Sequence, residues 1–254
     1  MDRKVALVTG AGRGIGRGIA LAFARAGYDV CVHYNQSAVM AEDTVRQIQE
    51  TGVHAEALQA DISVMEGIQA LFQQFSERFD RLDIHVNNSG ITRMKPFLET
   101  TPELYDEVMN TDLKGLYFCS QHAARLMVER GTRGAIINIS SNHSMGTWSN
   151  STVYAAAKAA VNKLTMNMAL DLAVYGIRVT GIAPGYTMIE KVDPVKAKPY
   201  IESVSSRIPM GRFATPLEVG EAAVYLASDN AGYITGTTLY MDGGALLPVW
   251  AERS

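Results

Sequence analysis

Short apolar runs alternate with longer amphipathic segments along the whole chain, and this alternation constrains the fold most strongly. Strands alternating with helices predict βαβ units, and therefore a parallel sheet covered by helices on both faces. We expect a single α/β domain spanning 1–254, with a doubly wound sheet of about seven strands. The predicted strands are 5–8, 30–34, 55–58, 84–87, 135–139, 177–182 and 238–241. The predicted helices are 15–26, 38–51, 64–79, 102–130, 152–175 and 216–228.

Composition excludes several classes of protein. Acidic residues exceed basic ones by 26 to 23, so nothing indicates a nucleic-acid partner. The two cysteines, Cys31 and Cys119, lie in apolar runs and are predicted to be buried thiols, as expected in a reducing compartment. No signal peptide or membrane span is evident, and the five histidines lack metal-ligand spacing. We therefore expect a cytoplasmic protein without a metal or a membrane partner.

A glycine-rich turn follows the first predicted strand and begins the first predicted helix. It reads Thr-Gly-Ala-Gly-Arg-Gly-Ile-Gly over residues 9–16, with glycines at every second position. Such a turn lets the backbone approach a pyrophosphate, which then lies at the N-terminus of the helix. This context favours a Rossmann-like dinucleotide site, although glycines alone are also compatible with a purely structural turn.

The end of the second predicted strand bears on which dinucleotide binds. An NAD site usually places an acidic residue there to hold the ribose 2′-hydroxyl. Residues 31–37 contain no acid, and Asp29 precedes the strand as a turn residue. Arg13 could face a 2′-phosphate, with Asn35 and Ser37 donating hydrogen bonds. The sequence therefore favours NADP(H), with NAD(H) as the alternative.

Tyr154 and Lys158 are four residues apart in a predicted helix, so they share one face. A neighbouring ammonium group favours phenolate, and a phenol with a lowered pKa suits proton transfer near neutral pH. Alone, this pair is equally compatible with an ordinary surface helix. Beside a dinucleotide turn, it predicts an active site.

One long irregular stretch, about 185–212, precedes the last predicted helix and carries Pro194, Pro199 and Pro209. Long loops in compact domains are usually lids or binding loops, so we expect it to cover the substrate. The alternative is a passive surface excursion.

These motifs resemble those of the short-chain dehydrogenase/reductase (SDR) family over nearly the whole chain. Asp61 resembles the residue that contacts adenine, and Asn-Asn-Ser-Gly at 87–90 is similar to the family's Asn-Asn-Ala-Gly. Ser141 precedes Tyr154 by thirteen residues, the family's usual separation. The resemblance implies a cofactor site made of Gly10, Gly12, Arg13, Gly14, Ile15, Gly16, Tyr34, Asn35, Ser37, Asp61, Ile62, Asn88, Ser89, Gly90, Tyr154, Lys158, Pro184, Gly185 and Thr187.

The resemblance also implies a catalytic set of Asn110, Ser141, Tyr154 and Lys158. Tyr154 would act as general acid or base, Ser141 would bind the substrate oxygen, and Asn110 would hold a water molecule that serves the lysine. The chain departs from the family at Ile189, where a threonine is common, and Thr187 is expected to replace it. Thr180 and the polar segment 142–144 are further departures.

The substrate site is predicted to comprise Ser141, His143, Trp148, Tyr154 and Tyr186. The polar stretch 142–150 favours a sugar or polyol, because polar groups beside one aromatic wall suit such a substrate. The apolar residues Tyr186, Met188, Ile189 and Val192 favour a hydrophobic ketone or 3-oxoacyl substrate instead.

Two further alternatives are a non-catalytic dinucleotide sensor, since fold does not imply function, and a sugar-nucleotide epimerase, whose larger C-terminal domain this chain lacks. The resemblance implies a homotetramer paired through helices 102–130 and 152–175. The apolar tail 245–250 is expected to pack on a neighbouring subunit or to line the rim of a site.

Overall fold

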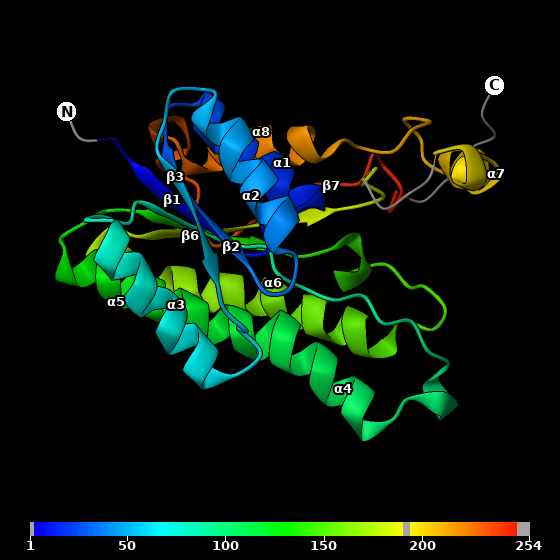
Figure 1. Ribbon diagram of the computed structural model, residues 1–254. Coiled ribbons are helices and arrows are strands. Elements are labelled where there is room, and N and C mark those ends of the chain that lie inside the picture. Colours follow the sequence, from blue (N-terminus) through cyan, green and yellow to red (C-terminus); the bar gives the residue numbers. More distant parts are fainter. Residues whose placement is uncertain (1–2, 190–193, 248–254) are drawn as a thin grey trace.

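A computed structural model describes residues 3–189 and 194–247. Its centre is one parallel sheet of seven strands in the order β3-β2-β1-β4-β5-β6-β7 (Figure 1). The strands are β1 (Val5–Val8), β2 (Asp29–Tyr34), β3 (Ala55–Gln59), β4 (Ile84–Asn87), β5 (Ala135–Ile139), β6 (Arg178–Pro184) and β7 (Thr238–Met241). The helices are α1 (Gly14–Arg25), α2 (Ala38–Gln49), α3 (Met65–Arg78), α4 (Pro102–Met109), α5 (Leu116–Glu129), α6 (Thr152–Leu172), α7 (Pro194–Ser205) and α8 (Pro216–Ala227).

Helices cover both faces of this sheet, as the alternation of the sequence predicts. In Figure 1, α1, α2 and α8 lie on one face, and α3, α5 and α6 lie on the other. Side chains alternate along each strand, so every strand contributes to two cores. In β1, Ala6 and Val8 belong to the core under α1 and α8, whereas Val5 and Leu7 belong to the core under α3 and α5.

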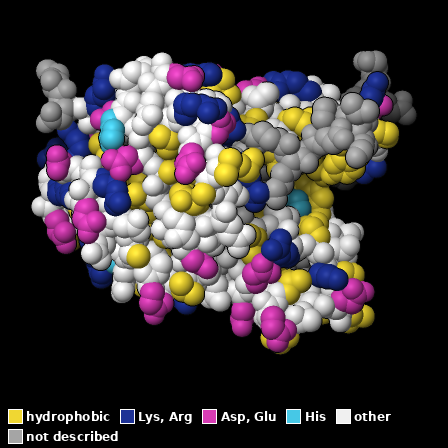
Figure 2. Space-filling view, in the orientation of Figure 1, with side chains coloured by type: hydrophobic (Ala, Val, Ile, Leu, Met, Phe, Trp, Pro, Cys, Tyr) yellow, Lys and Arg dark blue, Asp and Glu magenta, His cyan; other side chains and the backbone are white. Residues whose placement is uncertain are grey.

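The strand order creates a switch point between β1 and β4. The chain runs outward from β1 to β3, returns to β4 beside β1, and then runs outward again to β7. Ligands of open α/β sheets bind beyond the carboxyl ends of the strands at such a point. Figure 2 shows a hollow at this end of the molecule, with apolar side chains and an imidazole visible in it.

The predicted helix 102–130 is helical from 102 to 129 but not uniform. A π-helical segment, Asn110–Gly115, joins α4 to α5. Gly115 lies so close to the loop after β3 that a Cβ atom would approach the carbonyl oxygen of Ile62 to 2.7 Å. The extra residue in this turn directs Asp112 into the protein interior, where its side chain is fully buried.

The predicted irregular stretch 185–212 contains a helix, α7, so that part of the expectation is wrong. Pro194 begins α7, a position that tolerates proline, and Pro199 lies inside the helix. The stretch is held at its start, because Met188 donates to the carbonyl oxygen of Ala214 over 2.8 Å. Positions 190–193, including Val192, lie outside the described residues, as does the tail from 248 to 254.

Candidate active site

The glycine turn joins β1 to α1 at the switch point. Gly10 and Gly14 have positive φ angles of 63° and 56°, which favour glycine. A Cβ atom at Gly16 would lie 2.3 Å from the carbonyl oxygen of Gly10, so only glycine fits there. Gly14 and Gly16 thus carry no Cβ atoms in the first turn of α1, which eases close approach of a pyrophosphate to the helix N-terminus.

Two neighbouring segments fix the conformation of this turn. The side chain of Asn88, just after β4, donates to the carbonyl oxygens of Thr9 and Gly10 over 2.9 and 3.2 Å. On the other side, Nδ1 of His33 accepts a hydrogen bond from the Gly10 N–H over 3.2 Å. Burial lowers the pKa of His33 to about 4, so its ring is neutral at physiological pH. Sequence reasoning missed His33, although a histidine inside an apolar strand was a visible signal.

The expected ribose and adenine contacts lie beside the turn, at the ends of β2 and β3. Arg13 is exposed and forms no ion pair within the described residues, whereas Arg17 is held by Asp43 at 2.7 Å. Burial acts to raise the pKa of Asp61, but hydrogen bonds from Ser63 and Asn35 outweigh it and lower the pKa. Ser37 precedes α2, Tyr34 ends β2, and Ile62 is buried beside the π-helical segment.

Tyr154 and Lys158 lie on the same face of α6. The Lys158 ammonium nitrogen is 5.6 Å from the centre of the Tyr154 ring, so the i, i+4 spacing brings the two side chains together. Lys158 is almost fully buried, and its Nζ donates to the carbonyl oxygen of Ile139 over 3.1 Å. Ser141 follows β5 and is buried, and its Oγ accepts from the backbone N–H of His143 over 3.2 Å.

The second contact of Lys158 is an acid. Oδ2 of Asp112 lies 3.2 Å from its Nζ. Asn110 instead lines a surface hollow with Leu113, Tyr117 and other residues of α5 and α6. Asp112 is thus the direct partner of Lys158. The expected role of Asn110, which is to hold a water molecule that serves the lysine, stays a prediction. A signal for Asp112 was present in the sequence, because it is an acid at i+4 from Val108 on the buried face of a helix.

The predicted substrate residues form a continuous aromatic wall. The His143 and Trp148 rings stack with centroids 3.9 Å apart, and His143 also meets the edge of Tyr154 at 5.4 Å. The indole N–H of Trp148 donates to the Tyr186 hydroxyl over 3.2 Å. Burial lowers the pKa of His143, and its Nδ1 lies 2.7 Å from the hydroxyl of Ser151. The wall therefore combines flat apolar faces with polar edges, next to the tyrosine.

The turn after β6 closes the site on the remaining side. Gly185 donates to the carbonyl oxygen of Met241 over 2.9 Å, which ties the Pro184-Gly185 turn to β7. The hydroxyl of Thr187 donates back to the carbonyl oxygen of Gly185 over 3.2 Å. Ile189 packs against the glycine turn, since its Cγ2 is 3.4 Å from the Cβ position of Gly14. Ser89 and Gly90 follow β4, where Ser89 lies against Gly10 and Gly90 lies against Asp112.

The comparisons with known proteins agree with this geometry. A family model described as enoyl-(acyl carrier protein) reductase matches residues 10–245. A 3-oxoacyl-[acyl-carrier-protein] reductase from Staphylococcus aureus is 39% identical over 95% of this chain and 97% of its own length. The chain belongs to the short-chain dehydrogenase/reductase family. As an SDR protein, it is an oxidoreductase that acts on hydroxyl or carbonyl groups with a nicotinamide dinucleotide.

Solved structures of other SDR proteins carry diverse substrate names. An acetoin dehydrogenase from Enterobacter cloacae has a TM-score of 0.90, with 34% identity and 99% coverage of both chains. A candidate 2-deoxy-D-gluconate 3-dehydrogenase from Agrobacterium tumefaciens, with bound NADP, has a TM-score of 0.88, with 34% identity and 98% coverage of both chains. The SDR family thus fixes the reaction class of this chain, and its own side chains must decide the substrate.

Proposed function

We propose that this SDR protein is an NADP(H)-dependent oxidoreductase that interconverts a secondary alcohol and a carbonyl group in a sugar, polyol or small ketone. The observation that carries the proposal is the contact between Tyr154 and a buried Lys158, beside Ser141 and at the switch point of the sheet. We further place this activity in the cytoplasm, because two buried free cysteines suit a reducing compartment. None of the helices within 3–189 and 194–247 is long and apolar enough to cross a membrane.

Each catalytic side chain has one role in this proposal. Tyr154 donates its proton to the carbonyl oxygen in reduction and accepts it in oxidation. Ser141 donates a hydrogen bond to the same oxygen, where negative charge develops in the transition state. Lys158 stabilises negative charge on the phenol oxygen and is expected to bind the ribose hydroxyls. The dinucleotide, when bound in the glycine turn, supplies or accepts the hydride.

The preference for NADP(H) rests on charge at the end of β2. No acid is available there to hold a ribose 2′-hydroxyl, and Arg13 is exposed beside the turn. A guanidinium group suits a 2′-phosphate, because it donates two parallel hydrogen bonds. NADP bound to the Agrobacterium protein is consistent with this choice.

The preference for a sugar, polyol or small ketone rests on the aromatic wall. Stacked rings bind the C–H faces of a sugar, and the polar edge of His143 and the hydroxyl of Tyr186, which Trp148 orients, bind hydroxyl groups. A second candidate is reduction of a 3-oxoacyl thioester, which the name of the Staphylococcus aureus relative favours. The partly exposed Met188 and Ile189 offer an apolar surface for such a chain.

The deciding experiment follows reduced-nicotinamide absorbance over a panel of sugars, polyols, acetoin-like ketones and 3-oxoacyl thioesters, each with NADP(H) and NAD(H). We expect turnover with at least one hydroxyl-rich or small substrate. Tyr154→Phe should lower kcat at least 10³-fold while NADPH binding survives, since proton transfer alone is lost. Tyr233→Phe, a fully exposed tyrosine, is the matched control. Nucleotide binding without turnover on any substrate would favour the sensor instead.

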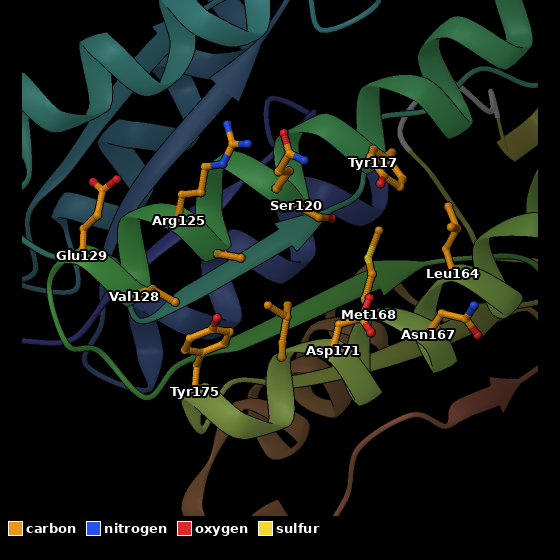
Figure 3. A pocket seen from close by; sticks show the side chains of 13 residues that line it. Tyr117, Ser120, Arg125, Val128, Glu129, Leu164, Asn167, Met168, Asp171 and Tyr175 are labelled. Carbon is orange, nitrogen blue, oxygen red and sulfur yellow. The ribbon is translucent and has the colours of Figure 1, made fainter.

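We also propose that the protein assembles with further copies of itself through α5 and α6, as a homotetramer. A hollow of about 530 Å³ runs between these helices (Figure 3). Leu170 and Val174 beside it are 79% and 81% exposed, and Arg125 and Asp171 on its walls offer both signs of charge. Such a patch suits self-complementary, two-fold contact. Light scattering should give a multiple of the chain mass, which Leu170→Glu reduces and the control Leu98→Glu does not.

A further inference from the structure

The ion pair between Asp112 and Lys158 is buried in the protein interior. The Asp112 side chain is fully buried and that of Lys158 is 5% exposed. Oδ1 of Asp112 accepts from the backbone N–H of Ile91 over 2.8 Å. Oδ2 faces the lysine and lies over Gly90, where a Cβ atom would approach it to 2.8 Å. The loop after β4, at Gly90 and Ile91, therefore fixes this carboxylate against the lysine.

Stability alone gives no reason for this arrangement. Removing two charges from water costs about as much as their attraction returns, so a hydrophobic pair of similar size is often equally stable. In the proposed function, Lys158 also needs an N–H group that is free to donate a hydrogen bond to the phenol oxygen or to the ribose hydroxyls. Its Nζ has three N–H groups; it donates to Ile139 and lies 3.2 Å from Oδ2 of Asp112, so at least one donor is left over for the site.

Two ionisable side chains, Asp112 and Tyr154, act on the charge of Lys158. Burial acts to lower the pKa of Lys158, but Asp112 and Tyr154 outweigh burial and raise it. Asp112 belongs to the π-helical segment and Tyr154 to α6 itself. His143 contacts the ring of Tyr154 and is not among the groups that shift the pKa of Lys158. Asp112 is thus the one carboxylate paired with Lys158 among the described residues.

We propose that Asp112 is a positioning residue that keeps Lys158 protonated and partly cancels its field at Tyr154, and so sets the pH range of alcohol oxidation. This inference rests on the proposed function, because it concerns the same tyrosine and lysine. An uncompensated ammonium would favour the anionic phenol more strongly. Without the carboxylate, the buried ammonium group of Lys158 would also lose its own proton more readily.

The first test is the pH profile of kcat/KM for oxidation in Asp112→Asn. The amide has the shape of the carboxylate and still accepts from Ile91, so the fold is kept. We expect the acidic limb to move by about one pH unit to lower pH, with a new alkaline decline below pH 10. Asp106→Asn, which removes an exposed charge from α4, should leave the profile unmoved. A uniform loss of rate without a shift would overturn the proposal.

The second test needs no turnover. In the wild type the pKa of Lys158 is raised, so its contribution to stability is present below pH 10.5 and lost above it. Without the carboxylate, burial lowers that pKa, so Asp112→Asn should gain stability as the pH rises toward 10.5. We expect the urea midpoint of the variant to lie below the wild type at pH 7, with the gap at least halved at pH 10. A constant gap would refute the charge role, even if no substrate is found.

Discussion

We predict that protonation of His33 at acid pH breaks a hydrogen bond that holds the dinucleotide turn in place. Its Nδ1 accepts from the Gly10 N–H over 3.2 Å, and its Nε2 lies 3.1 Å from the carbonyl oxygen of Ala60. A backbone N–H can only donate and a carbonyl can only accept, so these partners fix one neutral tautomer. A second proton, on Nδ1, would meet the Gly10 N–H directly, because that N–H occupies the ring nitrogen.

The magnitude follows from the pKa, which burial lowers from 6.5 to about 4. Between these values the unfolded chain binds more protons, so stability is complete above pH 6.5 and falls as the pH falls toward 4. At pH 5 the loss from His33 is about 2 kcal/mol, and it approaches about 3 kcal/mol at pH 4. His85 is also buried with a pKa near 4, so the wild type should lose about 4 kcal/mol by pH 5 from both.

The assay is urea unfolding at pH 8 and pH 5, with NADPH binding at each pH. His33→Asn keeps an acceptor for Gly10 but cannot be protonated, so its acid loss should be about half that of the wild type. His54→Asn, on a largely exposed histidine, should lose as much as the wild type. If His33→Asn is too unstable, titration of the histidine ring protons by NMR gives the same answer. An unchanged acid loss in His33→Asn, or a ring titrating near 6.5, would contradict the reasoning.

Two further predictions concern the cofactor site. Arg13→Ala should raise KM for NADP at least tenfold and leave KM for NAD unchanged, because only the 2′-phosphate needs the guanidinium. The control is Arg25→Ala, at the other end of α1. An equal effect of Arg13→Ala on both nucleotides would contradict the assignment. Gly16→Ala should destabilise the protein by about 3 kcal/mol and abolish NADPH binding, because its Cβ overlaps Gly10. The comparison is Gly52→Ala, which meets open space and is strained only by its φ of 85°, so it should lose about 1 kcal/mol and still bind NADPH. Thermal melting and nucleotide titration decide, and a wild-type melt for Gly16→Ala would contradict the overlap.

The strands could be predicted closely because they are buried on both faces. The run Val5–Val8 contains only apolar residues, and each of its side chains enters one of the two cores. Strand β6 extends two residues beyond its predicted end, through Pro184, because Met241 pairs with it there. That extension depends on a neighbouring strand, and the local sequence does not contain it.

The misses have two causes. The π-helical segment between α4 and α5 depends on contacts of Gly115 and Asp112 with segments remote in sequence, and periodicity alone indicates a uniform helix. Helix α7 was missed because Pro199 lies inside it, and an internal proline normally indicates a loop.

Local spacing alone determined that this chain carries a dinucleotide turn and a tyrosine facing a lysine, since neighbouring residues on a turn or a helix need no distant partner to be placed. Only the tertiary structure decided that Asp112 faces Lys158 and that Trp148 reaches Tyr186. These partners are separated by 38 residues or more, and the order of the parallel strands brings them together. The sheet thus converts separate local motifs into one site.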